Sequence, residues 1–263
     1  MDRDWKEIVI IVLVAAVIIA VVVSAVFAYS GLNRPLTVVE SNSMQHSDDT
    51  SYLGIIDTGD MVVMVSPDKM DVTTFVEGAQ NGYWKFGSYG DVIIYYRVAK
   101  NPVIHRAILW LDYDETTSKW SAPSLKNYPE DRWYNEGTWD DLKGVLVLRN
   151  LPYKDGYVDA SINLDDLAQH SGYLTKGDNN GYFDQMTTIH VDAVQKSELK
   201  SIAGEEIPWL GCIKLLVKDK NTNMIPKNSI PCLFIFFIDV IAFIALISML
   251  LDYRHRLKES NEE

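Results

Sequence analysis

The sequence predicts a mainly β domain placed between an N-terminal and a C-terminal transmembrane helix. Three observations lead to this fold class. The apolar residues of the 263-residue chain are concentrated near its two ends. The segment between them contains short β-branched and aromatic runs bounded by Gly, Pro, Asp or Asn, which are typical of β-strands. The chain length leaves room for one domain of ordinary size between the apolar ends.

The first apolar run predicts a transmembrane helix over residues 8–29, preceded by a cytoplasmic tail over residues 1–7. The run contains no charged residue, and a helix of this length is ~33 Å long, about the thickness of the hydrocarbon core of a bilayer. A cleavable signal peptide is the alternative, but it needs a shorter apolar run and a small-x-small exit, which residues 24–28 supply poorly. We therefore expect the helix to be retained.

The second apolar run predicts a transmembrane helix over residues 231–251, followed by a cytoplasmic tail over residues 252–263. It carries one acid, Asp239, which a bilayer tolerates near an interface, in protonated form or against a partner. A contact with a partner and a protonated or hydrated acid both remain open for Asp239. It is not one of the candidate site residues.

Basic residues flank the two apolar runs on their terminal sides. They are Arg3, Lys6, Arg254, Arg256 and Lys258. Because short cytoplasmic segments retain Lys and Arg, we expect a multi-pass protein of the cell membrane with both termini in the cytoplasm and residues 30–230 as the extracytoplasmic domain. This domain carries 19 Lys and Arg against 28 Asp and Glu, which does not favour binding to anionic lipid.

Charge and cysteine content exclude several classes of protein. A formal net charge of -12 argues against nucleic acid as a partner, because phosphate backbones repel acidic surfaces. Cys212 and Cys232 allow at most one disulfide, too few for a small disulfide scaffold, and they lack metal-ligand spacing. The sequence indicates neither a metal nor another cofactor.

The extracytoplasmic domain is expected to consist mostly of strands. The predicted strands cover residues 61–65, 91–96, 104–111, 144–148 and 213–217. Weaker helical signals cover residues 164–170, with Asn163 as the N-cap, and residues 192–202. The polar and aromatic stretch 113–141 has no clear period, and we expect it to form a surface insertion.

Three separated segments of this domain carry residue types that serve in nucleophilic catalysis: a serine motif soon after the first span, a histidine in an apolar run and a loop with two carboxylates. The candidate residues are Ser41, Ser43, His105, Asp178 and Asp184. Each segment also has a commoner role. Most serines are solvated, and a lone histidine in an apolar strand is more often a core residue. The loop is not typical of calcium sites, because Tyr182 breaks the alternation of oxygen ligands.

In their chain order, these segments resemble the motifs of type I signal peptidases of the archaeal and endoplasmic-reticulum kind. That family has a serine in S-x-S-M, a histidine in an H-R pair and a G-D-N-N-x-x-x-D loop, which match residues 41–44, 105–106 and 177–184. Residues 90–93 and 207–211 are similar to its G-D-[VI]-[VI] and I-P-x-x-G segments.

The resemblance extends over residues 36–111 and 172–217. Each motif is weak alone, and the ordered set behind a membrane anchor is specific. It implies a signal-peptidase-like domain in which residues 112–171 are an insertion. Three tryptophans lie there, Trp120, Trp133 and Trp139, and they are expected either to pack a core of the insertion or to lie at the membrane interface.

The resemblance also implies a role for each candidate residue. Ser43 is the expected nucleophile and His105 its general base. Asp184 is expected to orient the imidazole, with Asp178 nearby in the same loop, and which of the two is the main orienting acid stays open. Ser41 is expected to complete an oxyanion hole with the backbone N–H of Ser43. A serine needs such a base to give up its proton, and the acid fixes the tautomer of that base.

Two other bases remain open. Lys100 would give a serine–lysine mechanism like that of the bacterial members of the family, and His46 lies only three residues from Ser43. A further lysine, Lys176, is expected to balance the charge of the acidic loop. The proline that often follows the S-x-S-M serine is absent, which leaves the local turn open.

The expected function is that of a serine endopeptidase which removes N-terminal signal peptides from secreted preproteins after a small-x-small motif. Its expected partners are these preproteins, membrane lipid and, by proximity, the Sec translocon. Two alternatives remain open. One is another membrane-anchored serine protease that acts on extracytoplasmic proteins, and the other is a non-enzymatic membrane assembly subunit.

Overall fold

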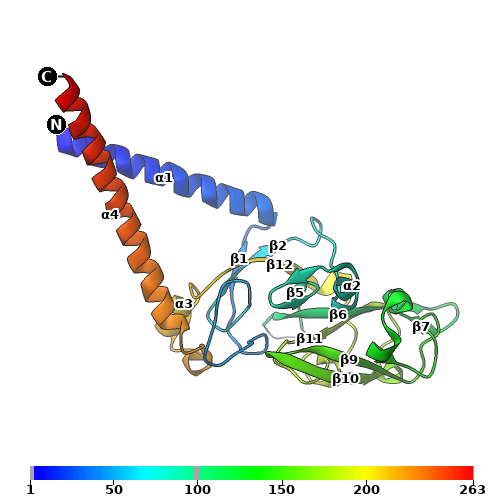
Figure 1. The fold of residues 1–263 in the computed structure, drawn as a ribbon. Helices are drawn as coiled ribbons and strands as arrows, with labels where there is room; N and C mark the ends of the chain where they lie inside the picture. The colour runs from blue at the N-terminus through cyan, green and yellow to red at the C-terminus, as the bar shows by residue number, and fades with distance from the viewer. Residues whose placement is uncertain (1–2, 98–100, 263) are drawn as a thin grey trace.

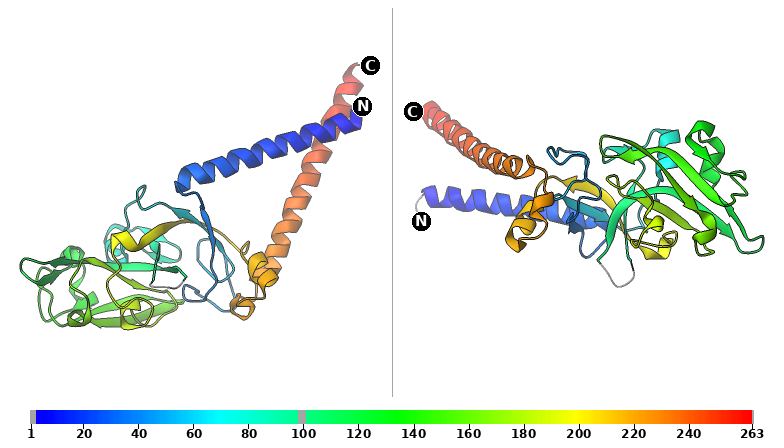
Figure 2. Two further views of the ribbon diagram at one scale, coloured as in Figure 1. Left: turned by 180° about the vertical axis from the view of Figure 1, so that it is seen from behind. Right: turned by 90° about the horizontal axis from the view of Figure 1, so that it is seen from below.

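The computed structural model describes residues 3–97 and 101–262 and consists of a β-rich domain from which two long helices extend (Figure 1). Helix α1 (Arg3–Ser30) precedes the domain, and α4 (Ser229–Glu262) follows it. Both helices leave the domain on the same side, so the start of α1 and the end of α4 lie away from the sheets in every view (Figures 1 and 2).

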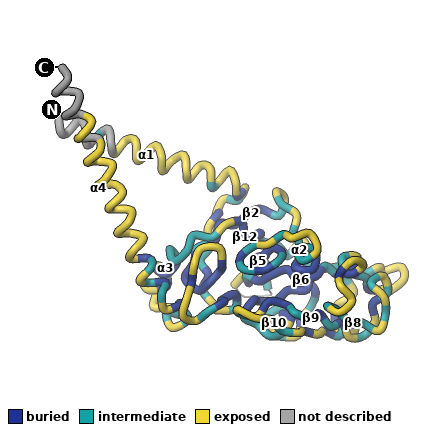
Figure 3. The backbone as a smooth tube through the Cα atoms, viewed as in Figure 1, coloured by how far each residue is buried: buried dark blue, intermediate teal, exposed yellow. Residues whose placement is uncertain are grey.

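Both long helices contain a segment that is long and apolar enough to cross a membrane, Val12–Ser30 in α1 and Ser229–Leu250 in α4. Other parts of the protein bury at most 6 % of either segment, and both helices are exposed along most of their length (Figure 3). The helices predicted over residues 8–29 and 231–251 are thus confirmed as long apolar helices with little protein packed around them.

The central sheet has the strand order β1-β2-β12-β5-β6-β11, with β7 paired to the far end of β6. All neighbouring strands are antiparallel. The strands are β1 (Leu36–Val38), β2 (Met61–Val65), β12 (Leu199–Ile207), β5 (Val92–Tyr95), β6 (Val103–Asp114), β11 (Gly172–Lys176) and β7 (Lys119–Ser121). β12 comes last in the chain but lies between β2 and β5, so it joins the first two strands to the rest of the sheet.

Smaller elements complete the domain. A second sheet has the order β10-β9-β8, and β3 pairs with β4 in a short hairpin. The bounds of these strands and of the two short helices are β8 (Trp133–Tyr134), β9 (Val145–Tyr153), β10 (Gly156–Asn163), β3 (Trp84–Lys85), β4 (Ser88–Tyr89), α2 (Phe75–Asn81) and α3 (Cys212–Lys218). Thr74 begins α2 with a capping box, and Gly82 ends it in the left-handed conformation.

The largest hydrophobic cluster lies between the two sheets. It joins Leu109 of β6 and Phe183 of the acidic loop to Leu146 and Leu148 of β9. The stretch 113–141, expected as a surface insertion, contributes buried side chains to the same cluster, namely Trp120, Leu125 and Tyr128. Trp133 and Trp139 pack against it while partly exposed. The tryptophans therefore pack the protein, and this stretch is part of the main core.

The prediction of a strand over residues 213–217 is wrong, because this segment lies in helix α3. Cys212 and Leu215 are both buried, and their three-residue spacing places them on one face of a helix. Asp219 ends the helix in the left-handed conformation, and its N–H caps the carbonyls of Leu215 and Leu216. A short apolar run fits both the period of a helix and the period of a strand. Here the packing of this segment against α4 favours the helix.

The prediction of a helix over residues 192–202 is also wrong. The segment contains the short 3₁₀ helix Lys196–Glu198 and then the start of β12, whose pairing with β2 and β5 overrides a weak local preference. The helix predicted over residues 164–170 is shorter than expected. It is the 3₁₀ helix Leu164–Asp166, and Asn163 caps it as predicted by accepting the N–H of Asp165.

The fold class is confirmed in its main features: antiparallel sheets are flanked by long apolar helices at both ends. With these helices included, the chain is mixed α and β rather than mainly β. The strands predicted over residues 61–65, 91–96, 104–111 and 144–148 are present as β2, β5, β6 and β9.

Candidate active site

His105 and Arg106 are consecutive residues of β6, so their side chains leave the strand on opposite faces. The strand pairs His105 with Ile93 of β5 and Arg106 with Lys176 of β11. Both side chains are buried, with 2 % and 0 % exposed. Buried polar groups of this kind need hydrogen-bond partners, and a different aspartate serves each of them.

Asp184 is the partner of His105. Its Oδ2 lies 2.6 Å from His105 Nδ1, and both side chains are buried. Burial alone would raise the pKa of Asp184, but the charge and hydrogen bond of His105 lower this pKa below its usual value. The ionised carboxylate therefore holds a proton on Nδ1 and leaves Nε2, on the other side of the ring, as the basic nitrogen.

Tyr95, at the end of β5, is a second partner of Asp184 that the sequence did not reveal. Its hydroxyl donates to Asp184 Oδ2 at 2.7 Å and lies 3.1 Å from Thr175 Oγ1. Burial raises the pKa of Tyr95 well above its usual value, so the hydroxyl remains a donor. In the sequence, Tyr95 ends an apolar run whose neighbourhood is only a general candidate for the substrate pockets, and no signal there marks its hydroxyl as a partner of Asp184.

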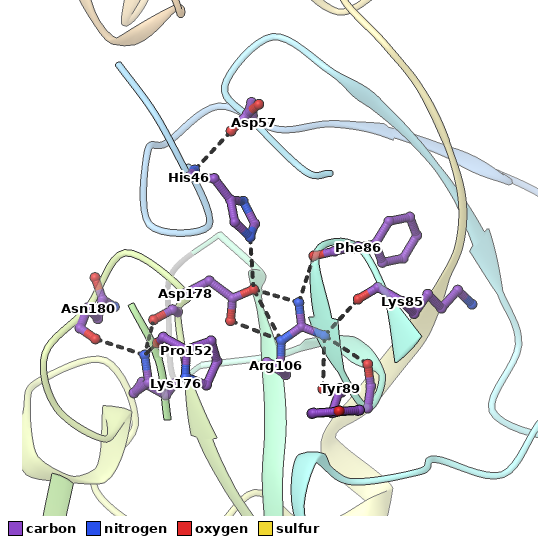
Figure 4. A network of polar contacts seen from close by, with 12 residues as sticks. His46, Asp57, Lys85, Phe86, Tyr89, Arg106, Pro152, Lys176, Asp178 and Asn180 are labelled. Carbon is purple, nitrogen blue, oxygen red and sulfur yellow. Dashed lines mark hydrogen bonds and ion pairs between the residues drawn. The ribbon is translucent and has the colours of Figure 1, made fainter. Parts of the chain in front are cut away.

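Asp178 has Arg106 as its partner instead of His105 (Figure 4). Arg106 Nε and Nη2 lie 2.9 and 2.5 Å from the two carboxylate oxygens, and its other N–H groups donate to backbone carbonyls of residues 85–90. Both side chains are fully buried. Burial would raise the pKa of Asp178, but the guanidinium lowers it. Asp178 thus fixes the acidic loop to β6 and the β3–β4 hairpin.

The serine segment is held against the acidic loop by hydrogen bonds that Asn179 donates to its backbone carbonyls. The Asn179 N–H donates to the carbonyl of Ser43 at 2.8 Å, and Asn179 Nδ2 donates to the carbonyl of Asn42 at 2.8 Å. Gly177 lies at the closest approach, where an added Cβ would collide with the Ser43 carbonyl and lie 2.9 Å from His105 Nε2. The main-chain carbonyl of Ser43 and Nε2 of His105 therefore both lie next to Gly177.

The Ser43 hydroxyl is hydrogen-bonded to the Ser41 hydroxyl at an Oγ–Oγ distance of 3.2 Å. In the described part of the chain, no hydrogen bond joins it to His105. The next residue, Met44, is fully buried and anchors the segment in a small hydrophobic cluster. The backbone at Ser43 is thus fixed on both sides of the residue, and its hydroxyl is directed to Ser41.

A groove of about 490 Å³ contains Ser41, Ser43 and His105. Its lining also includes residues 37–40, in and after β1, and Ile94, Val103 and Ile104 of β5 and β6. Neither Asp178 nor Asp184 is among the described residues that line it. The structure therefore places the two hydroxyls and the imidazole at the surface of one groove, with both carboxylates behind them.

The other bases considered from the sequence are placed differently. His46 is buried outside the groove, and its Nε2 lies 3.8 Å from Asp178 Oδ2, an ion-pair distance too long for a hydrogen bond. Burial lowers its pKa. Lys176, the last residue of β11, is buried beside the acidic loop, where its ammonium donates to the carbonyls of Pro152, Gly177 and Asn180, and burial lowers its pKa to about 8. Lys100 lies outside the described residues.

The arrangement supplies the parts of nucleophilic catalysis: a hydroxyl, an imidazole with one nitrogen fixed by a carboxylate, and a second hydroxyl beside the first. Comparison with models of known protein families finds no match, and comparison with curated proteins finds none at a significant level. A proposal for the function therefore has to be based on the residues of this groove and their chemistry.

Proposed function

We propose that this chain is a membrane-bound signal peptidase, a serine endopeptidase that removes N-terminal signal peptides from secreted preproteins. One observation carries the proposal: Ser43 and His105 line the same groove, and His105 Nδ1 lies 2.6 Å from the buried carboxylate of Asp184. The order of motifs along the chain supports the same class of enzyme.

In the proposed reaction, the Ser43 hydroxyl leaves Ser41 and bonds to His105 Nε2, since catalytic hydrogen bonds often form fully only with substrate present. Ser43 Oγ attacks the scissile carbonyl carbon while Nε2 takes the hydroxyl proton. His105 then gives that proton to the leaving amine, and the C–N bond breaks. A water molecule, deprotonated by His105, hydrolyses the acyl-enzyme and restores Ser43.

Two groups stabilise charge during these steps. Asp184 compensates the imidazolium that forms when His105 takes the proton. The Ser41 hydroxyl and the Ser43 N–H donate to the oxyanion of the tetrahedral intermediate, and each such donor is worth ~3 to 4 kcal/mol of the barrier. The 3.2 Å contact between the two serine hydroxyls supports this role for Ser41, because it holds the donor beside the nucleophile.

The two long apolar helices fit a membrane anchor at each end of the domain. In this arrangement both termini are cytoplasmic and residues 30–230 lie outside, near the Sec translocon. A substrate whose apolar segment is held in the bilayer then presents its cleavage site close to the groove, which raises its local concentration. β1 is an edge strand that lines the groove, so an extended substrate can pair with it.

The test is cleavage of a purified preprotein in detergent, with a small-x-small motif before the cleavage site. We expect the wild-type protein to cleave once, after that motif, and Ser43→Ala and His105→Ala to lose activity while they remain folded by circular dichroism. Ser161→Ala removes an exposed hydroxyl on β10 and is the matched control that keeps full activity.

The same experiment separates the alternatives. Serine-dependent cleavage at sites that lack small residues would indicate a different membrane-anchored protease. Cleavage that persists in Ser43→Ala would overturn the proposed nucleophile. No cleavage by the folded wild-type protein would leave a non-enzymatic assembly subunit as the better interpretation.

A further inference from the structure

The groove beside Ser43 is basic, although the whole chain is acidic. Its described lining includes four cationic side chains and one carboxylate. The cations are Arg97, Lys200, Lys214 and Lys220, and the carboxylate is Glu40. The chain carries a net charge of -12, so an excess of positive charge at this one place is not a consequence of overall composition.

At one end of the groove, two lysines share the single carboxylate. Lys214 Nζ lies 2.9 Å from Glu40 Oε1, and Lys220 Nζ lies 2.5 Å from Glu40 Oε2. The hydrogen bonds from Lys220 and Lys214 lower the pKa of Glu40, so it stays ionised. One carboxylate balances only one of the two ammonium groups. This end therefore keeps a net positive charge while its lysines are held in place.

The third lysine of the groove, Lys200, lies at a bulge of β12, where the pairing with β5 shifts between Leu199 and Ser201. It is half-buried and lines the groove. Within the described part of the chain, neither Lys200 nor Arg97 forms an ion pair with a carboxylate. A half-buried ammonium that faces a groove without a counter-ion is a ready partner for an anionic ligand group.

We propose that this groove selects peptides that carry Asp or Glu close to the scissile bond and disfavours peptides with Lys or Arg there. The inference rests on the proposed function, since it concerns the substrate of the same site. A substrate carboxylate supplies the charge that the lysines lack, whereas a substrate ammonium is repelled. Repulsion of the wrong substrate by like charge contributes to specificity together with attraction of the right one.

The test is a series of preproteins that differ at one position near the scissile bond, with Ala, Asp or Lys in turn. We expect kcat/KM for the Asp substrate to exceed that for the Lys substrate by about fivefold at the position that meets the lysines, the effect of a partly exposed ion pair. The ratio should fall toward one in about 1 M salt, where the screening length is ~3 Å.

Variants of the groove residues test whether the preference for Asp over Lys in the substrate comes from this groove. Lys200→Gln and Lys214→Gln are expected to lower the Asp/Lys ratio, and Glu40→Gln to raise it, because it removes the competing carboxylate. Lys218→Gln is the matched control: Lys218 lies on the same helix as Lys214, is exposed and does not line the groove. It removes the same charge and should leave the ratio unchanged.

Failure of this inference differs from failure of the proposed function. If the Ala substrate is cleaved through Ser43 but the Asp and Lys substrates are cleaved equally at every position, the charge preference is overturned and the enzyme assignment stands. The same holds if the ratio is unaltered in Lys200→Gln and in Lys214→Gln. If the Ala substrate is not cleaved, the proposed function fails and this inference fails with it.

Discussion

The two aspartates of the acidic loop serve neighbouring residues of β6 in contrasting ways. Asp178 forms a bidentate, fully buried pair with Arg106, away from the groove. Asp184 binds one nitrogen of His105 and leaves the other facing Gly177 and Ser43. Side chains alternate along a strand, so the two residues of the His105–Arg106 pair point in opposite directions. Arg106 fixes the acidic loop, and His105 reaches the groove.

A third buried carboxyl group, that of Asp60, shows how a neighbouring cation changes the pKa of a buried aspartate. Asp60 is 1 % exposed and accepts N–H bonds from Asp57 and Trp209. In the described part of the chain it has no cationic partner. Burial raises its pKa from 3.8 to about 8, whereas the pKa values of Asp178 and Asp184 are lowered. Backbone hydrogen bonds alone therefore do not keep a buried aspartate ionised here, and an adjacent cation does.

The largest expected effect distinguishes Asp184 from Asp178 in catalysis. Asp184→Asn removes the charge that fixes the tautomer of His105, and we expect kcat to fall by ~10⁴-fold with the fold retained. Steady-state cleavage of a preprotein measures the loss, and circular dichroism reports folding. A rate within tenfold of wild type would show that Asp184 does not orient the base.

Asp178→Asn should act on stability instead. It leaves the buried Arg106 guanidinium without its counter-ion, and we expect a loss of about 3–5 kcal/mol in the free energy of unfolding. Chemical denaturation in detergent measures the loss, with Asp155→Asn, at an exposed acid, as the control. A variant of unchanged stability whose kcat collapses would reverse the assignment of the two aspartates.

The contrast with Asp60 predicts a dependence of stability on pH. Its folded pKa, about 8, lies above its usual value of 3.8, so the stabilisation from the protonated group is complete below pH 3.8. It is lost as pH rises toward 8. Between pH 5 and pH 7, two units inside this range, we expect wild type to lose about 2–3 kcal/mol relative to Asp60→Asn, as ~1.4 kcal/mol accompanies each unit. Parallel denaturation curves of the two proteins would contradict this.

The smallest expected effect concerns Tyr95, which donates the second hydrogen bond to Asp184. Tyr95→Phe removes that bond, worth ~1.5 kcal/mol for a charged acceptor, and we expect kcat to fall about tenfold while the His105 contact remains. Tyr157→Phe, at a residue with 73 % of its surface exposed, is the control. Full activity of Tyr95→Phe would mean that His105 alone holds the carboxylate.

Part of this arrangement was predictable from the sequence. The order of motifs identified Ser43, His105 and the two carboxylates as neighbours, because each motif is local and recognisable. The division between Asp178 and Asp184 was not predictable, since it depends on which face of β6 each cation occupies. Tyr95 and Lys200 were missed for a similar reason: each lies in an ordinary strand segment, and only the pairing of β5 with β6 and β12 brings it to the site.

The position of β12 has a consequence for how the protein is made. The segment that carries Ser43 connects β1 to β2, His105 belongs to β6, and in the sheet β12 lies between β2 and β5. During synthesis both of these segments leave the ribosome before β12. The strand that holds them side by side begins only after residue 198. The segments that carry Ser43 and His105 are therefore held side by side only after nearly all of the β-rich domain has left the ribosome.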